Sequence, residues 1–283
     1  MKLLRYGPAG QEKPGVVDAD GKVRDISSIV PDLEGAHLSK ESLARIAAAD
    51  LSSLPLAPEG ARIGPCVARV GNFICIGLNY VDHAHESNLP IPAEPIVFNK
   101  APSSIVGPND TVVIPHGSQK TDWEVEIAAV IGTEAFMVDE ASALDHVAGY
   151  TICNDVSERA FQAERGGQWT KGKSAPTFGP IGPWIVTPDE VGDVQKLDMW
   201  LDVNGERRQT GNTATMIFSM AHVVSYVSQF MRLEPGDIIT TGTPPGVGMG
   251  MKPSPVYLKA GDTMALGIEK LGRQDQKVVA YGG

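Results

Sequence analysis

The sequence predicts a mixed, mainly β fold that carries a small N-terminal α+β domain. Most of the 283 residues fall into short runs with strand character, which glycine and proline separate. These runs do not alternate with regular helices, and that argues against a Rossmann fold or a TIM barrel. One long helical pattern, at residues 215–231, occurs in the larger part of the chain. We expect two domains, at residues 1–67 and 68–283.

The first predicted domain combines a short meander with a helix. The segments KLLRY and PGVVDADGKVRDIS, with a turn at Asp20-Gly21, have the pattern of short antiparallel strands. A helix should follow in SKESLARIAAADLSSLP, with Ser39 as its N-cap. The segment LAPEGARIGP has the composition of a linker, and FICIGLNY opens the larger domain.

In the larger domain, the strand DWEVEIAAVIG at residues 122–132 raises a question of charge. It is apolar on both faces, so we expect it to be buried on both sides. Glu124 and Glu126 nevertheless share one face, about 7 Å apart, because a strand rises about 3.3 Å per residue. Two like charges in a core are costly unless a cation or a shared proton compensates them. Further along, Asn204-Gly205 predicts a tight hairpin.

Charge and cysteine content exclude several classes of function. The formal net charge of −10 argues against a broad nucleic-acid surface. The three cysteines match neither a zinc pattern nor a disulfide framework, and their apolar neighbours predict buried, reduced thiols. The N-terminus lacks the apolar segment of a signal peptide, and no later run is long enough to span a bilayer. We expect a cytoplasmic protein without nucleic-acid or membrane partners.

An acidic set predicts a metal site. Asp155 lies just past an apolar strand that ends near Asn154. Together with Glu124 and Glu126 it would offer only oxygen ligands, which suit Mg²⁺, Mn²⁺ or Ca²⁺ better than Zn²⁺. The alternative is a sheet edge with solvated acids, and spacing alone does not decide between the two.

Two further groups of polar residues could serve such a site. A helix that starts near Asp155 would place Arg159 and Gln162 on the same face, where the arginine could clamp a carboxylate. The alternative is an ordinary ion pair on an exposed helix. His83 and Glu86 are three residues apart, and a glutamate that polarises a histidine makes it a better general base. The alternatives are a solvated polar turn and, for residues 83–95, a mobile lid.

Two loops complete the candidates. Lys171 and Lys173 alternate in the glycine-rich segment GGQWTKGKS, and one of them could meet a developing oxyanion. The alternative is a lysine that faces solvent. The segment TTGTPPGVGMG, at residues 240–250, lacks the features of a P-loop. Its backbone N–H groups and the Thr243 hydroxyl could bind a ligand carboxylate, or it could be a plain tight loop.

Taken together, these motifs resemble the fumarylacetoacetate hydrolase family. The matching segments cover most of residues 70–270 in the family's order: IGLNYVDHAHE, DWEVEIAAVIG, GYTICNDVSERAFQ, WTKGKS, MIFSMAHVVSYVSQFMRLEPGDIITTGTPPGVG and LKAGD. The resemblance implies a β-roll core in the larger domain and a homodimer or homotetramer. It also implies one Mg²⁺ or Mn²⁺ ion on Glu124, Glu126 and Asp155.

The same resemblance assigns the remaining site residues. The His–Glu dyad of the smaller acylpyruvase-like members falls on His83 and Glu86, and the catalytic lysine falls on Lys173. In founding members the glutamate comes from elsewhere in the chain. The substrate-binding side chains of the family fall on Arg159, Gln162 and Thr243.

The N-terminal segment and ERGGQWTKGKS resemble a narrower bacterial branch, which includes hydrolases of 2,4-diketo-3-deoxy-L-rhamnonate. We therefore expect Mg²⁺-dependent hydrolysis of a C–C bond in a 2,4-diketo acid, best that sugar acid, giving pyruvate and lactate. The alternatives on the same site are an acylpyruvase and an oxaloacetate decarboxylase or tautomerase. An alternative from another class is a non-catalytic module that binds keto acids.

Overall fold

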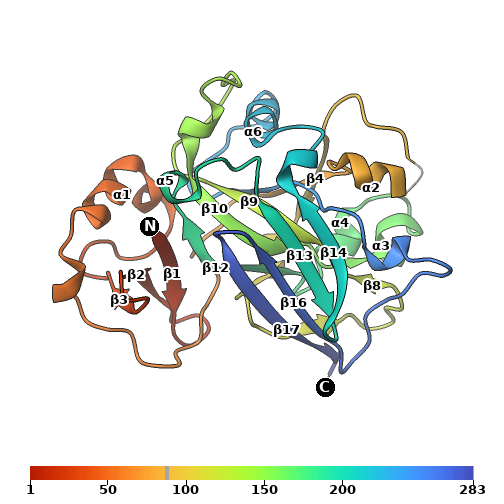
Figure 1. The fold of residues 1–283 in the computed structure, drawn as a ribbon, viewed down its shortest axis with the longest axis horizontal. Helices are drawn as coiled ribbons and strands as arrows, with labels where there is room; N and C mark the ends of the chain where they lie inside the picture. The colour runs from red at the N-terminus through yellow and green to blue at the C-terminus, as the bar shows by residue number, and fades with distance from the viewer. Residues whose placement is uncertain (87–88, 283) are drawn as a thin grey trace.

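Two β-sheets form the framework of the protein, whose computed structural model describes residues 1–86 and 89–282 (Figure 1). Within these residues the larger sheet has ten strands, in the spatial order β3 (Val23–Asp25), β2 (Lys13–Val17), β1 (Lys2–Tyr6), β12 (Gly179–Val186), β10 (Val147–Asn154), β9 (Val125–Ile131), β15 (Ile238–Thr240), β4 (Phe73–Gly77) and β5 (Ile96–Lys100), with β6 (Ile105–Val106) paired to β12. The smaller sheet contains β14 (Glu206–Asn212), β13 (Asp198–Val203), β16 (Thr263–Ile268), β17 (Gly272–Ala280) and β7 (Val112–Ile114). A separate short ladder joins β8 (Thr121–Asp122) and β11 (Ser157–Glu158).

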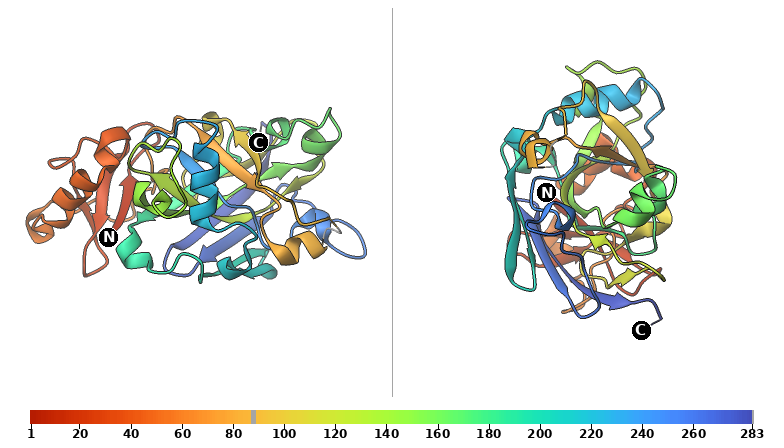
Figure 2. Two further views of the ribbon diagram at one scale, coloured as in Figure 1. Left: turned by 90° about the horizontal axis from the view of Figure 1, so that it is seen from above. Right: turned by 90° about the vertical axis from the view of Figure 1, so that its right-hand side faces the viewer.

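The helices are short and lie around the strands, with the N-terminal segment at one end of the molecule and α2 and α3 at the other (Figures 1 and 2). Their bounds are α1 (Lys40–Ala47), α2 (Val81–Glu86), α3 (Arg159–Ala163), α4 (Thr170–Lys173), α5 (Pro188–Val191) and α6 (Met220–Ser228). The predicted mixed, mainly β fold is therefore confirmed. In the described part of the chain, no helix is long and apolar enough to cross a membrane.

Several local predictions are confirmed. Ser39 caps α1 by accepting the Ser42 N–H. Asn204 and Gly205 form the tight turn between β13 and β14, both with positive φ as a type I′ hairpin requires. The three cysteines are buried and free.

The helix predicted at residues 215–231 is shorter than expected. It begins at Met220, because the Ser219 hydroxyl caps it by accepting the His222 N–H at 3.1 Å. Just before this cap, the Asn79 side chain accepts the Phe218 N–H at 2.8 Å and donates to the Phe218 carbonyl at 3.1 Å. These bonds take the backbone groups that another helical turn would need.

The N-terminal strands do not form a sheet of their own. β1, β2 and β3 pair antiparallel, as predicted, but β1 also pairs with β12 of the larger domain. One sheet therefore runs across the predicted boundary between residues 67 and 68, and that boundary stays a prediction.

β9 is buried along its whole length, as expected, and separates two apolar cores. Its odd-numbered residues, from Val125 to Ile131, pack in a core with residues of β10, β13, β16 and α6. Ala128 and Val130 face a second core, which includes Leu3 and Val16 of the N-terminal strands. Because strand side chains alternate, Glu126 lies on the same face as Ala128.

β10 brings the third acid to this position. It pairs antiparallel with β9, with Asn154 opposite Val125. Just beyond the end of the ladder, the Glu124 carbonyl accepts the Asp155 N–H at 2.9 Å. Glu124 thus precedes β9 rather than lying within it, and Asp155 follows β10 directly beside it.

Candidate active site

Glu124, Glu126 and Asp155 come together as the sequence predicted. One oxygen atom from each carboxylate lies within 4.8 Å of the others, and all three side chains are buried. Oxygen ligands at such separations suit a hard divalent cation such as Mg²⁺ or Mn²⁺. The donor set therefore fits a divalent metal ion.

Buried cations already compensate two of the three carboxylates. Lys173 Nζ lies 2.8 Å from Glu124 Oε2 and 2.7 Å from Asp155 Oδ2. Lys100 Nζ donates to Asp155 Oδ1 at 2.6 Å, and Arg159 Nη2 lies 2.7 Å from Glu124 Oε1. Sequence reasoning missed Lys100, the last residue of β5. Its one signal is a charged residue at the end of the apolar run PIVF.

Glu126 differs, because in the described structure it has no ion pair and accepts its hydrogen bond from the Gly242 N–H at 3.0 Å. Burial raises the pKa of Glu126 well above its usual range, and the charges of Asp155 and Glu124 raise it further. Burial acts in the same direction on Glu124, but the charges of Lys173 and Arg159 outweigh it and lower the pKa of Glu124 below its usual range.

A charge count shows what the site lacks. Four buried carboxylates face three buried cations: Asp122, Glu124, Glu126 and Asp155 against Lys100, Arg159 and Lys173. The single uncompensated negative charge needs a proton on Glu126 or an added cation. A divalent ion would leave the cluster with one net positive charge, which favours an anionic ligand.

The His83–Glu86 pair forms on α2. His83 Nδ1 lies 3.2 Å from Glu86 Oε2, and both Glu86 oxygens also accept the Gly246 N–H at 3.1 Å. Burial would raise the pKa of Glu86, but the hydrogen bonds from His83 and Gly246 outweigh it and lower the pKa. Glu86 is therefore a fixed carboxylate that orients the imidazole. The predicted lid, residues 83–95, includes residues 87 and 88, which lie outside the described residues.

Arg159 and Gln162 meet, but not on the predicted helix. We expected a helix from near Asp155, whereas α3 begins at Arg159. Ser157 and Glu158 pair instead with β8, and the Glu158 carboxylate caps α3 by accepting the Ala160 N–H. Arg159 Nη1 still donates to Gln162 Oε1 at 3.1 Å.

The 240–250 loop was open to two interpretations, a turn that binds a ligand carboxylate and a plain tight loop. In the structure three of its N–H groups bind carboxylates of the protein itself: Gly242 donates to Glu126, Gly246 to Glu86, and Gly248 to Asp122. The Thr243 hydroxyl donates to the Val125 carbonyl at 2.9 Å and accepts from Gln209 Nε2 at 2.8 Å. The loop thus ties together acids from three segments. Sequence reasoning could not foresee this, because those acids are distant in the chain.

A small cavity of about 40 Å³ joins these groups. Its walls are Ile76, Gly77, Leu78, His83, Phe98, Glu124, Glu126, Gln162, Trp169, Lys173, Gly242 and Thr243. Six predicted site residues are among them; Glu86, Asp155 and Arg159 stand behind these walls. Lys171, the other candidate lysine, is exposed and donates to the Arg165 carbonyl.

No sequence pattern indicated the aromatic wall of this cavity. The rings of Phe98 and Trp169 meet edge to face with centroids 5.2 Å apart. Gly77 makes room for this wall, because a Cβ there would lie 2.5 Å from the Trp169 ring. Lys173 Nζ lies 5.1 Å from the centroid of the Phe98 ring, which favours its charged form.

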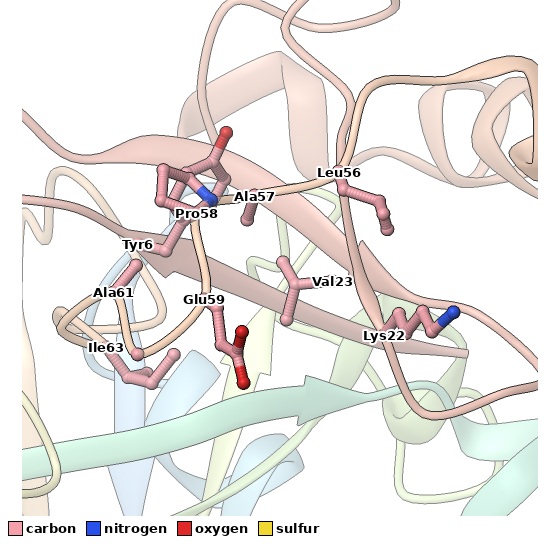
Figure 3. Close-up of a pocket in the computed structure, with 10 residues that line it drawn as sticks. Tyr6, Lys22, Val23, Leu56, Ala57, Pro58, Glu59, Ala61 and Ile63 are labelled. Atoms are coloured by element: carbon pink, nitrogen blue, oxygen red, sulfur yellow. The ribbon is translucent and has the colours of Figure 1, made fainter.

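A larger hollow of about 500 Å³ lies elsewhere, between the N-terminal strands and the 56–63 segment (Figure 3). Tyr6, Val23 and Leu56 are among its lining residues. It contains none of the predicted site residues, and no group of metal-binding side chains lies there in the described structure. The smaller cavity is the candidate active site because the acids, the base and the cations converge there.

This fold and this cavity bring a carboxylate cluster that could hold a divalent metal ion close to a histidine–glutamate pair. The family model for the fumarylacetoacetate (FAA) hydrolase C-terminal region matches residues 72–279. The chain belongs to the fumarylacetoacetate hydrolase family.

Known relatives extend over nearly the whole chain. A protein of Burkholderia ambifaria, which is provisionally named a hydrolase, is 64% identical over 98% of both chains. The structure of a fumarylacetoacetate hydrolase from Exiguobacterium antarcticum is similar with a TM-score of 0.88 and 38% identity over 99% of both chains. A maleylpyruvate hydrolase from Sphingobium sp. SYK-6, solved with manganese(II) and pyruvate, has a TM-score of 0.81 and 30% identity over 99% of both chains.

Proposed function

We propose that this protein hydrolyses a C–C bond of a 2,4-diketo acid with the help of Mg²⁺ or Mn²⁺. One observation carries the proposal: Glu124 and Glu126 of the carboxylate cluster line the same cavity as His83, whose imidazole Glu86 holds from behind. The maleylpyruvate hydrolase that was solved with manganese and pyruvate supports it, because pyruvate is the product that we expect. When bound, the metal ion would polarise the keto acid and hold the charge of the pyruvate enolate.

In this reaction His83 takes a proton from the water that attacks C4 of the substrate. Glu86 holds the imidazole through Nδ1, which leaves Nε2 as the base. Lys173 has three N–H donors, and Glu124 and Asp155 accept two of them. The third has no hydrogen-bond partner among the described residues, and it would stabilise the oxyanion at C4 before the C3–C4 bond breaks. Gln162 lines the same cavity and can donate to the substrate.

Within this class, we propose 2,4-diketo-3-deoxy-L-rhamnonate as the substrate, with pyruvate and lactate as products. The far end of this acid carries one hydroxyl and one methyl group. Gln162 and His83 offer polar partners for the hydroxyl, and the wall formed by Ile76, Phe98 and Trp169 offers apolar contact for the methyl group.

A substrate comparison tests the proposal. The purified protein is supplied with Mn²⁺ and given the hydroxylated diketo acid, acetylpyruvate or oxaloacetate, while pyruvate and carbon dioxide are measured. We expect pyruvate from both diketones, with kcat/KM at least about 10-fold higher for the hydroxylated acid. Equal or faster turnover of acetylpyruvate would remove the sugar-acid assignment. Carbon dioxide release from oxaloacetate far above any diketone cleavage would identify a decarboxylase instead.

A further inference from the structure

Asp122 holds a position that the proposed reaction does not use. Its side chain is fully buried on β8, two residues before Glu124, and it does not line the cavity. It accepts four hydrogen bonds: from Arg159 Nε at 2.8 Å, Gly248 N at 2.7 Å, Met249 N at 3.0 Å and Trp123 N at 2.9 Å. A carboxylate with this many fixed donors is held in one orientation.

Arg159 is shared between Asp122 and the metal cluster. Its Nε donates to Asp122, and its Nη1 donates to Gln162. Its Nη2 lies 2.7 Å from Glu124 Oε1, so the guanidinium forms ion pairs with both carboxylates. Asp122 therefore fixes the orientation of the guanidinium and takes part of the charge that would otherwise serve Glu124 alone.

The same carboxylate is connected to the base. Gly248 and Met249, which donate to Asp122, follow Gly246, whose N–H holds Glu86. Trp123, the neighbour of Asp122, donates from Nε1 to the Gly246 carbonyl at 3.1 Å. The four residues 246–249 thus bind both Glu86, which holds His83, and Asp122, which holds Arg159.

We propose that Asp122 is a positioning residue that sets the metal affinity of the site by sharing the Arg159 guanidinium with Glu124. The inference rests on the metal site of the proposed function. Without the charge of Asp122, the guanidinium would pair with Glu124 alone and compete with the metal ion for that carboxylate. Partners of metal ligands typically change metal affinity about 10–100-fold when they are removed.

The test measures Mn²⁺ binding by calorimetry, without substrate. Asp122→Asn keeps the size of the side chain but removes its charge, and we expect its Kd for Mn²⁺ to rise at least about 10-fold. The matched control is Asp110→Asn, because Asp110 also pairs with an arginine, Arg62, and accepts a backbone N–H, from Gly107. Asp110 lies away from the cavity, so its variant should bind Mn²⁺ like the wild type.

A second variant distinguishes an effect of Asp122 on the position of Arg159 from an effect on folding. In Asp122→Asn combined with Arg159→Gln, both charges are absent, so no unpaired charge is buried and no guanidinium competes for Glu124. We expect this double variant to bind Mn²⁺ no more weakly than the wild type, even if Asp122→Asn alone fails to fold. Wild-type affinity in a folded Asp122→Asn, or a double variant weaker than the wild type, would overturn the inference. A wild type that binds no Mn²⁺ would instead remove the metal site of the proposed function.

Discussion

Lys100 Nζ donates to Asp155 Oδ1 at 2.6 Å, and both side chains are completely buried. Lys173 Nζ holds the other oxygen of the same carboxylate at 2.7 Å. Asp155 is therefore compensated before any metal ion binds, whereas Glu126 is not. The three predicted metal ligands look alike in the sequence, but they contribute differently to the stability of the metal-free protein.

Replacing Lys100 should destabilise the metal-free protein and increase the stabilisation that metal provides. Lys100→Met keeps the length of the side chain but leaves Asp155 with one cation and the Val156 carbonyl without this donor. We expect a loss of about 3 kcal/mol in the free energy of unfolding, the lower end for a broken buried pair. The added divalent ion should then raise Tm by more than it does in the wild type, because it compensates a larger negative charge.

Lys171→Met is the matched control for this variant, since Lys171 lies in the same segment as Lys173 but is exposed. Its Tm should stay close to that of the wild type with and without metal. A Lys100→Met protein whose metal-induced rise in Tm equals that of the wild type would contradict the charge argument.

Glu126→Gln should stabilise the metal-free protein increasingly as the pH rises. The folded-state pKa of Glu126 lies well above its ordinary value of 4.5. A group with a raised folded pKa contributes stability below its unfolded pKa and loses it as the pH rises through the folded pKa. Unfolding of both proteins in a chelating buffer, over a series of pH values, measures the difference directly. A difference that shrinks with rising pH would show that another group compensates the charge of Glu126.

Neutralising Glu124 or Asp155, the two other predicted metal ligands, should destabilise the metal-free protein instead of stabilising it. From the sequence alone, neutralising Glu124 or Asp155 would relieve like-charge repulsion and leave the stability of the metal-free protein unchanged or slightly higher. In the structure each of them accepts a hydrogen bond from Lys173, so Asp155→Asn leaves buried ammonium charge uncompensated. We now expect Asp155→Asn to lower the free energy of unfolding of the metal-free protein by about 3 kcal/mol. Urea unfolding of the metal-free Asp155→Asn and Glu126→Gln variants, measured beside the wild type, gives the sign of each change in stability. Equal stability of the two variants would refute the distinction.

Gly246→Ala should disrupt the loop that holds Glu86. Gly246 has φ of +101°, and a Cβ there would lie 1.9 Å from the Arg208 carbonyl oxygen. Gly261 has a similar φ of +96° but no atom within 4 Å of an added Cβ, so Gly261→Ala isolates the cost of the backbone conformation. We expect about 1 kcal/mol for Gly261→Ala and at least about 3 kcal/mol for Gly246→Ala, measured by urea unfolding. Similar losses in both variants would mean that the loop tolerates the contact.

His83→Ala should lower the rate of turnover strongly while leaving metal binding intact. His83 lines the cavity but is not part of the carboxylate cluster, so the Kd for Mn²⁺ should not change. Loss of a general base typically costs about 10²–10⁴ in rate. Steady-state kinetics measures the loss of rate, and calorimetry measures the Kd for Mn²⁺. Unchanged kcat and ligand affinity would favour the keto-acid binding module over an enzyme.

Residues that act within one short segment could be predicted from the sequence. The acid pair Glu124 and Glu126 follows from strand alternation, and the contact between His83 and Glu86 follows from their spacing of three. Residues whose roles depend on distant partners were missed. Lys100 meets a carboxylate 55 positions away, and Asp122 meets Arg159 across 37 positions. No local pattern predicts such pairs, because the pairing of β8 with β11 places Arg159 beside Asp122, and the order of strands in the larger sheet brings β5 to the end of β10.

The most direct test of metal-dependent hydrolysis is pyruvate release from a 2,4-diketo acid by metal-stripped protein into which Mn²⁺ is titrated. We predict negligible turnover in the stripped protein and a rise that saturates near one metal ion per chain, because the structure brings together one carboxylate cluster in its described residues. Glu126→Gln, which keeps the shape of that cluster, should stay inactive at the same Mn²⁺ concentrations. Full turnover by the metal-stripped wild type would contradict the central claim.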